Sequence, residues 1–205
     1  KNLFKVNANN VSGAGDTILS SLVILDSIIK NKKKMINILN LVGKIVVSSK
    51  DICKINKKFI FNLLFLKKMG FSDFFIYKFF VKQKKIGFTN GCFDLLHAGH
   101  VTYLQKAREK CDFLIVGLNS DKSVKKLKGD LRPVISQVDR VRILSSLEFI
   151  DKIVMFDELT PKNMIKKIKP DFIFKGKDYK KKEVVGYREL KSWGGKVVLI
   201  DFVRN

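Results

Sequence analysis

The sequence has few of the residues that mark metal, disulfide or membrane proteins. Its 205 residues include two histidines, three cysteines and one tryptophan. The cysteines, Cys53, Cys92 and Cys111, form no CxxC pair and are odd in number, which favours a reducing compartment over a disulfide framework. No apolar run reaches the roughly 18 residues that cross a bilayer, and the first residues lack the order of a signal peptide. We therefore expect a cytoplasmic protein with no membrane partner.

Acidic residues are scarce beside basic ones, and the formal net charge is +22. A charge of this size is common in nucleic-acid-binding proteins. However, six of the 41 basic residues are arginine, the residue whose fork recognises bases and phosphates, and the lysines are spread along the whole chain. Nucleic-acid binding would instead favour arginine and aromatic residues clustered on one face. We predict a basic surface that attracts small anions and no nucleic-acid partner, and keep a basic nucleic-acid-binding protein as the alternative.

The C-terminal part, residues 86–201, alternates strand and helix patterns. Its strand-like runs are apolar without alternation, and helical patterns separate them. The expected strands are 86–89, 113–118, 152–156, 171–175 and 196–200, and the expected helices are 100–110, 138–147, 161–168 and 184–193. This order predicts an α/β fold with a Rossmann-like, doubly wound parallel sheet that is covered on both faces.

The N-terminal part has a different pattern. Helical patterns at 18–29 and 35–48 are accompanied by at most one short strand, which is too little to close a core. We interpret residues 1–65 as the tail of a larger domain, residues 66–84 as a linker with room for one helix, and residues 85–205 as the α/β domain.

Both histidines lie in one segment, Thr89–His100, between an expected strand and an expected helix. A glycine-bearing loop that opens a helix binds phosphate, because free backbone N–H groups and the helix dipole point at the anion. His97 and His100 can add donors to a developing negative charge. A buried core histidine is one alternative, and a zinc site is another, although this pair has only one nearby carboxylate.

The segment from Gly91 to His100 resembles the GxFDxxHxGH motif of the cytidylyltransferase-like nucleotidyltransferases. The string TNGCFDLLHAGH is similar to the adenylyltransferase half of the bifunctional heptose 7-phosphate kinase/heptose 1-phosphate adenylyltransferase family. The similarity covers about residues 85–202 and continues through segments 117–121, 127–134, 170–171 and 175–179, with Arg140.

This resemblance implies transfer of AMP from ATP to heptose 1-phosphate for lipopolysaccharide core synthesis. ATP would be a substrate, accompanied by Mg²⁺ because triphosphate charge usually requires a hard cation. The partners would be small molecules, a nucleotide and a sugar phosphate, and a homodimer is one option for the assembly. The motif contacts phosphates rather than the base, so a cytidylyltransferase for another phosphorylated acceptor stays open.

The N-terminal segment Ser12–Thr17 looks like the GAGD motif of ribokinase-like sugar kinases. The resemblance implies that Asp16 is the catalytic base and that Gly13 and Gly15 form an anion hole. The sugar-binding front of such a kinase is missing, so we expect kinase activity from a longer protein and none from this chain. The transferase family usually carries a Ser/Thr-rich phosphate-contacting segment after the last strand, which is not found before Asn205. We therefore expect a fragment with weakened nucleotide binding.

Within the transferase part, we predict that His97, His100 and Lys128 contact the phosphates during catalysis. Asp94 could orient its loop or lie near Mg²⁺, and Arg140 could reach the triphosphate or pair with Asp139 or Asp121. Phe93 could pack in the core instead of lining the pocket. Lys128 and Arg132 could be ordinary surface charges. Lys175 and Asp178 could stabilise their loop. Cys92 is expected to be a spectator thiol. The predicted nucleotide-binding residues are Thr89, Asn90, Gly91, Phe93, Asp94, Gly99, Asp121, Arg132, Arg140, Lys175 and Asp178.

Overall fold

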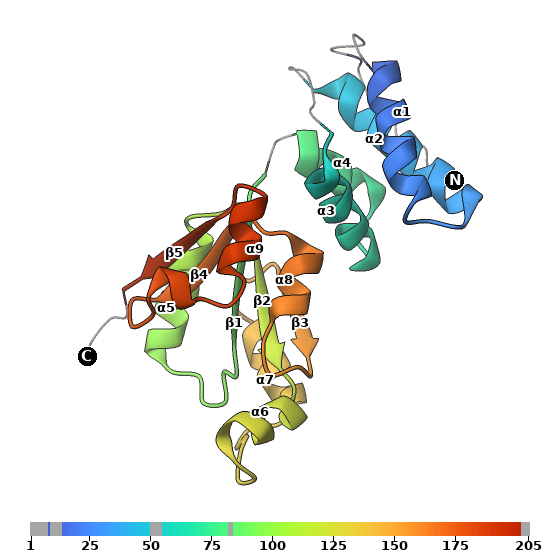
Figure 1. Cartoon of the computed structure of the whole chain (residues 1–205). Helices are drawn as coiled ribbons and strands as arrows, with labels where there is room; N and C mark the ends of the chain where they lie inside the picture. The colour runs from blue at the N-terminus through green and yellow to red at the C-terminus, as the bar shows by residue number, and fades with distance from the viewer. Residues whose placement is uncertain (1–7, 9–13, 50–54, 82–83, 202–205) are drawn as a thin grey trace. The chain divides into compact units, whose positions relative to one another are not determined.

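The computed structural model describes residues 8, 14–49, 55–81 and 84–201, and the chain divides into two compact units, Lys1–Lys84 and Lys85–Asn205 (Figure 1). The described part of the first unit is helical and contains no strand. Its helices are α1 (Ala14–Asp26), α2 (Lys32–Ser48), α3 (Lys57–Lys68) and α4 (Asp73–Val81). The stretch 66–84, predicted as a linker, thus carries the end of α3 and all of α4.

Side-chain caps determine where two of these helices begin. The Asn31 side chain accepts a hydrogen bond from the Lys34 N–H at 2.9 Å, and Asn56 does the same for Phe59 at 2.9 Å. Such caps satisfy a donor that has no partner within the helix. The apolar stripe of α2 is buried, with Leu41, Val42 and Ile45 almost inaccessible. The helices predicted at 18–29 and 35–48 are therefore present, as α1 and α2.

The second unit is built on a five-stranded parallel sheet with the order β3-β2-β1-β4-β5 (Figure 1). Each strand lies within two residues of its predicted position, because each coincides with an apolar run that a covered sheet can bury. The strands are β1 (Ile86–Gly91), β2 (Phe113–Asn119), β3 (Lys152–Phe156), β4 (Phe172–Gly176) and β5 (Lys196–Ile200). The predicted doubly wound α/β fold is thus confirmed.

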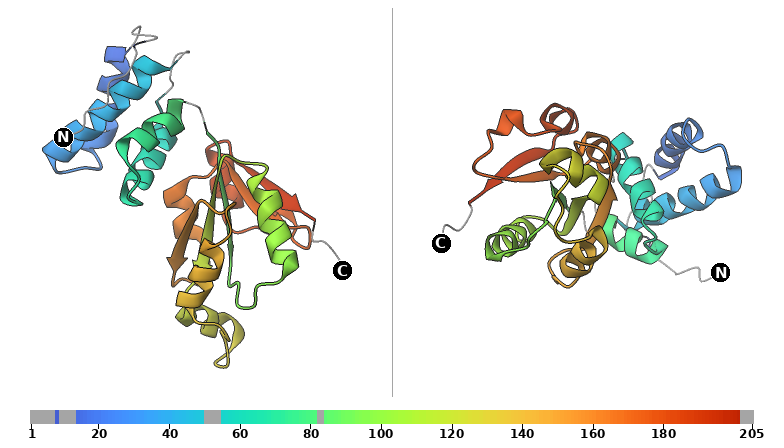
Figure 2. Two further views of the ribbon diagram at one scale, coloured as in Figure 1. Left: turned by 180° about the vertical axis from the view of Figure 1, so that it is seen from behind. Right: turned by 90° about the horizontal axis from the view of Figure 1, so that it is seen from below.

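Helices cover both faces of this sheet, with α5 and α7 on one face and α8 and α9 on the other (Figure 2). Leu104 of α5 and Leu144 of α7 pack in one core cluster with Leu114, Val116 and Leu118 of β2. The helices are α5 (Ala98–Arg108), α6 (Asp121–Lys128), α7 (Gln137–Ser145), α8 (Lys162–Ile168) and α9 (Tyr187–Ser192), with a 3-10 turn at Lys181–Glu183. Gly186, at φ 87°, separates that turn from α9, so the helix predicted at 184–193 is shorter than expected.

Helix α6 was not predicted, because it lacks an apolar stripe. Its sequence is DKSVKKLK, and Ser123 and Val124 are its buried residues. It is stabilised instead by Ser120, whose side chain accepts a hydrogen bond from the Ser123 N–H at 3.2 Å. Lys128 is consequently the last residue of this helix.

A crevice opens where β1 and β4 separate. The β1–β2 ladder runs from Ile86↔Phe113 to Gly91↔Leu118, whereas β1 and β4 pair at Gly87↔Phe172 and Phe88↔Ile173 alone. Strand order reverses direction between β1 and β4, and doubly wound sheets bind ligands at the carboxyl edge of such a switch point. The segment that carries both histidines leaves β1 at that edge.

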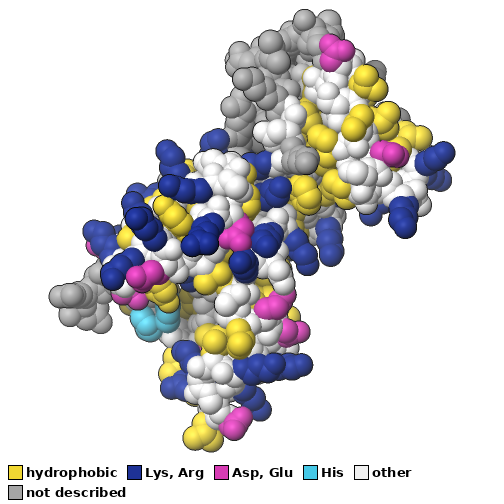
Figure 3. Space-filling view, viewed as in Figure 1, with side chains coloured by type: hydrophobic (Ala, Val, Ile, Leu, Met, Phe, Trp, Pro, Cys, Tyr) yellow, Lys and Arg dark blue, Asp and Glu magenta, His cyan; other side chains and the backbone are white. Residues whose placement is uncertain are grey.

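The surface of the chain is rich in basic side chains. Lys and Arg are scattered over the face in Figure 3, with Asp and Glu among them. In the described residues, no helix has both the length and the apolar character needed to span a bilayer.

Candidate functional site

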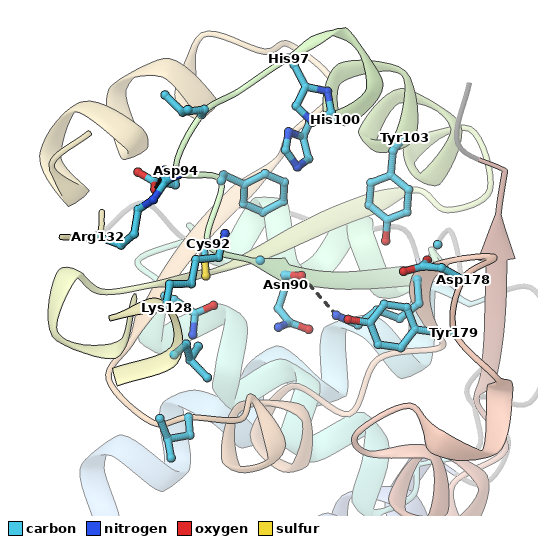
Figure 4. A pocket seen from close by; sticks show the side chains of 18 residues that line it. Asn90, Cys92, Asp94, His97, His100, Tyr103, Lys128, Arg132, Asp178 and Tyr179 are labelled. Atoms are coloured by element: carbon cyan, nitrogen blue, oxygen red, sulfur yellow. Dashed lines mark hydrogen bonds and ion pairs between the residues drawn. The ribbon is translucent and has the colours of Figure 1, made fainter. Parts of the chain in front are cut away.

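A cavity of about 580 Å³ lies at the carboxyl edge of the sheet. In Figure 4, Lys128 and Arg132 lie on one side of it, Asp178 and Tyr179 lie on the other, and Asn90 and His100 lie between them. Ten of the predicted residues line this cavity: Asn90, Gly91, Phe93, Asp94, His97, His100, Lys128, Arg132, Lys175 and Asp178. Three basic side chains and two carboxylates meet here.

The two histidines stand at the N-terminus of α5. His97 is the residue before the helix, and its side chain does not cap it. The His97 side chain therefore accepts no hydrogen bond from the first N–H groups of α5. This arrangement is favourable for binding an anion at the start of the helix. The His97 and His100 rings are 3.9 Å apart between centroids, and the Phe93 ring meets His100 edge-on at 5.3 Å. Phe93 is buried, although its φ of 46° is uncommon for a residue with a side chain.

The environment of His100 disfavours its charged form. Desolvation lowers the pKa of His100 below its usual value, and the nearby His97 and Lys128 lower this pKa further. In the free protein, His100 is therefore mainly a neutral imidazole near pH 7, with one N–H to donate. A bound phosphate would act in the opposite direction, since negative charge favours the imidazolium.

Asp94 anchors the loop that follows α6. Its carboxylate accepts hydrogen bonds from Nη1 of Arg132 at 2.7 Å and from the N–H groups of Val134 and Ile135 at 2.7 and 3.2 Å. Desolvation acts to raise the pKa of Asp94, but these hydrogen bonds and the Arg132 charge outweigh it and hold the pKa below its usual value. Of the two roles predicted for Asp94, loop orientation is the one that these contacts support.

Arg140 ties three parts of the site together. Its side chain is fully buried, and its guanidinium donates to the carbonyls of Cys92, Asn119 and Ile135. It also pairs with Asp121 at 2.8 Å between Nη2 and Oδ1. Neither Arg140 nor Asp121 lines the cavity. Arg140 therefore pairs with Asp121, one of the predicted alternatives, because a buried guanidinium needs several acceptors.

Several other predicted residues do not line the cavity. Thr89 is buried within β1, and its hydroxyl is 2.8 Å from that of Tyr103, so its side chain lies on the opposite face of the strand from Asn90. Gly99 lies in the first turn of α5 beside His97. Gly15 and the exposed Asp16 belong to the first unit, in α1, whereas every cavity residue belongs to the second. Gly13 lies outside the described residues.

The structure also brings in residues that were not predicted. Tyr103 of α5 reaches the cavity, as do Asn119 at the end of β2 and Tyr179 after β4. The position of Asn119 at a strand end was an available signal, because parallel strands share one carboxyl edge. Leu127 and Leu159 carried no such signal, since exposed leucines are common. Cys92, expected to be a spectator, lines the cavity, and burial raises the pKa of its thiol, which keeps it protonated.

Gly99 is expected to be required for the position of His97. A Cβ at Gly99 would lie 3.0 Å from Cε1 and Nδ1 of the His97 ring. Gly99→Ala should therefore displace this ring. In the AMP transfer that the resemblance implies, turnover should fall by about tenfold or more, since small misplacements are costly in catalysis. The substitution should not lower the melting temperature, because alanine favours helix. Gly43→Ala in α2, where a Cβ meets Ile18 at 3.5 Å, is the control. Unchanged turnover in Gly99→Ala would contradict this role.

The described residues hold no group of three or more His, Cys, Asp or Glu side chains that could bind a metal. Both Asp94 oxygens already accept hydrogen bonds. Mg²⁺ usually keeps phosphate oxygens and waters as ligands, with one or two carboxylates. The donor set therefore fits a cation that arrives with a polyphosphate and does not fit a resident metal.

Together, the crevice at the switch point, the histidine pair and the lysines place a candidate anion-binding site at the carboxyl edge of an α/β domain. Residues 88–205 match the family model described as Cytidylyltransferase-like. The chain belongs to this family.

The relatives share a more particular name. The chain is 47% identical over 205 residues to "Bifunctional protein HldE" of Campylobacter concisus (strain 13826), covering 95% of this chain and 42% of that protein. It is 59% identical over 120 residues to "Bifunctional protein HldE" of Methylobacillus flagellatus, covering 58% of this chain and 25% of that protein. The chain thus spans about two fifths of the first relative's length. A solved structure, the lipopolysaccharide core biosynthesis protein from Thermoplasma volcanium GSS1, has a TM-score of 0.49 and 24% identity, covering 60% of this chain and 98% of that one.

Proposed function

We propose that the second unit is an adenylyltransferase that transfers AMP from ATP to D-glycero-β-D-manno-heptose 1-phosphate, giving ADP-heptose and pyrophosphate. The observation that carries this proposal is the His97–His100 pair at the N-terminus of α5, which lines one cavity together with Lys128 and Lys175. The choice of heptose rests on the resemblance of segment 89–100 and on the bifunctional relatives. We place the reaction in the cytoplasm and its product in lipopolysaccharide core synthesis.

The chemistry requires no strong base. At neutral pH the sugar phosphate oxygen is already an anion, so it can attack the α-phosphorus directly. The protein has to hold two polyanions together and stabilise charge that develops on the phosphates. His97, His100, the first N–H groups of α5 and Lys128 would bind the triphosphate, which carries Mg²⁺ as part of the substrate. The anchored loop at Arg132 would keep these groups in place.

The proposal is tested by following pyrophosphate release from the 205-residue chain. The chain is incubated with Mg²⁺, β-heptose 1-phosphate and either ATP or CTP. We expect release with ATP and little with CTP. Glycerol 3-phosphate in place of the heptose is the control acceptor, and it should support no release.

Other outcomes separate the alternatives. Release with CTP and an alcohol phosphate, but not with ATP and heptose 1-phosphate, would favour a cytidylyltransferase for another acceptor. A longer chain, extended beyond Asn205, could be active where the 205-residue chain is not. That result would support the proposed reaction and would show that the added segment contributes to nucleotide binding. No release from either chain would overturn the heptose assignment.

A further inference from the structure

Lys175 is a charged residue of the cavity that has few contacts within the protein. Its ammonium donates one long hydrogen bond, 3.3 Å to the carbonyl of Asn90, and lies 5.4 Å from the centre of the Tyr179 ring. Within the described residues, no carboxylate lies within ion-pair distance of it. By contrast, Arg132 forms an ion pair with Asp94 at 2.7 Å, and the buried Arg140 has four acceptors.

Burial makes this position costly for a cation. Desolvation lowers the pKa of Lys175 to about 8, although Asp178 and Cys92 act to raise it. A partly buried ammonium with spare donors is expected to gain most from an anionic ligand, because burial strengthens the attraction. Lys175 is therefore a partly buried cation that has donors available for an anionic ligand.

The location of Lys175 indicates which part of a nucleotide it meets. It lies in β4, two residues beyond the last β4 residue that pairs with β1, and between Asn90 and Tyr179. Asp178 would repel phosphates but can accept hydrogen bonds from ribose hydroxyls, and Tyr179 offers a ring to a base. The β- and γ-phosphates would then extend away from Asp178 and Tyr179, toward the histidines and Lys128 (Figure 4). The α-phosphate would then lie between these two ends.

We propose that Lys175 is a catalytic residue that donates hydrogen bonds to the non-bridging oxygens of the α-phosphoryl group. This inference rests on the proposed adenylyl transfer. An oxygen of the acceptor phosphate forms a bond to the α-phosphorus, and the bond from that phosphorus to the bridging oxygen of pyrophosphate breaks. Pyrophosphate leaves with the electron pair, and Lys175 keeps its proton throughout. Its contribution is electrostatic and is largest when charge on the α-phosphoryl oxygens is largest.

The first test observes contact without turnover. Nuclear magnetic resonance of the lysine side chains, with Lys175 assigned by its loss in Lys175→Arg, follows its titration with and without ATP. Its midpoint, near 8 in the free protein, should rise when ATP binds. If ATP moves the resonances of His97 and His100 but not that of Lys175, the inference is wrong while nucleotide binding stands. If no resonance moves, nucleotide binding and hence the proposed function fail.

The second test measures kinetics. Lys175→Met should lower kcat by about 100- to 1,000-fold with a much smaller change in KM for ATP, as for removal of one transition-state donor. In the unsubstituted chain kcat/KM should fall above about pH 8, because the ammonium loses its proton there. Lys175→Arg, which stays charged, should recover part of kcat and lose this alkaline decline.

The matched control is Lys177→Met, two residues along the chain. The Lys177 side chain is exposed and pairs with Asp201 at 2.6 Å, outside the cavity. It should leave kcat and its pH profile unchanged. A Lys175→Met variant that keeps kcat and raises KM for ATP alone would show ground-state binding and overturn the catalytic role. If Lys175→Met does not fold, the arginine variant and the resonance titration decide the question.

Discussion

Pyrophosphate release should fall about 100- to 1,000-fold when His100 is replaced by alanine, because one preorganised donor to the phosphates is lost. His97→Ala should have an effect of the same order. The two rings are in contact, with centroids 3.9 Å apart, and they belong to the same helix start. The double variant should therefore lose much less than the product of the two single effects. Steady-state kinetics of the four proteins would measure this.

Gln105→Ala is the control for these variants, since Gln105 lies on the exposed face of α5. It should not change turnover. Full activity in His100→Ala, with the helix intact by circular dichroism, would refute the phosphate-binding role of this histidine. Equal losses in Gln105→Ala would attribute the effect to the helix instead.

The histidines should also report nucleotide binding through their protons. The free protein has a lowered His100 pKa, and the negative charge of a bound phosphate is expected to raise this pKa in the complex. The protein should therefore take up a proton when ATP binds at a pH between these two values, and ATP affinity should weaken as pH rises through that window. Since the chain has two histidines, their proton resonances can be assigned from the two single variants. A His100 titration that ATP does not shift would contradict this prediction.

Replacement of Arg140 by methionine is expected to have the largest effect on stability. It removes the donor to three backbone carbonyls and to Asp121, in a side chain that is fully buried. Breaking one side of a buried charged network costs about 3–5 kcal/mol of unfolding free energy. For a chain of this size this is roughly 6–20 °C in melting temperature. Calorimetry or urea unfolding would measure the loss.

Arg142→Met provides the comparison on the same helix. Arg142 is exposed and pairs with Asp139 at 3.5 Å, so its replacement should change stability by less than about 1 kcal/mol. Arg140→Lys should resemble the methionine variant more than the native protein, because one ammonium cannot reach four acceptors in different directions. A melting temperature in Arg140→Met equal to that of Arg142→Met would show that the network contributes little.

The secondary structure was predictable where burial follows sequence spacing. β2 is an unbroken apolar run because it is covered on both faces, and all of its residues are buried. Helix α6 was not predictable in this way, because few of its side chains face a core. Its Ser120 cap was a signal present in the sequence, but serine caps alone are too common to identify a helix.

The candidate site was predictable at the level of its loop. The His97–His100 motif indicated phosphate chemistry, because local order alone places both imidazoles at a helix start. The roles of Arg140 and Thr89 were not predictable. Arg140 is 48 residues from Cys92, and sequence spacing does not say which of several acceptors a guanidinium will meet. Thr89 faces Tyr103, and not the cavity that Asn90 lines, because successive side chains of a strand point to opposite faces.

The sequence by itself therefore determined the α/β architecture and the position of the phosphate-binding loop, since apolar runs, glycines and the histidine pair act over a few residues. The tertiary structure alone decided the strand order, the buried environment of Arg140 and the meeting of Lys175 with Asn90. These features depend on contacts between segments up to 85 residues apart. Such contacts form when the sheet closes and buries its helices, and burial then determines which charges are paired and which are left for a ligand.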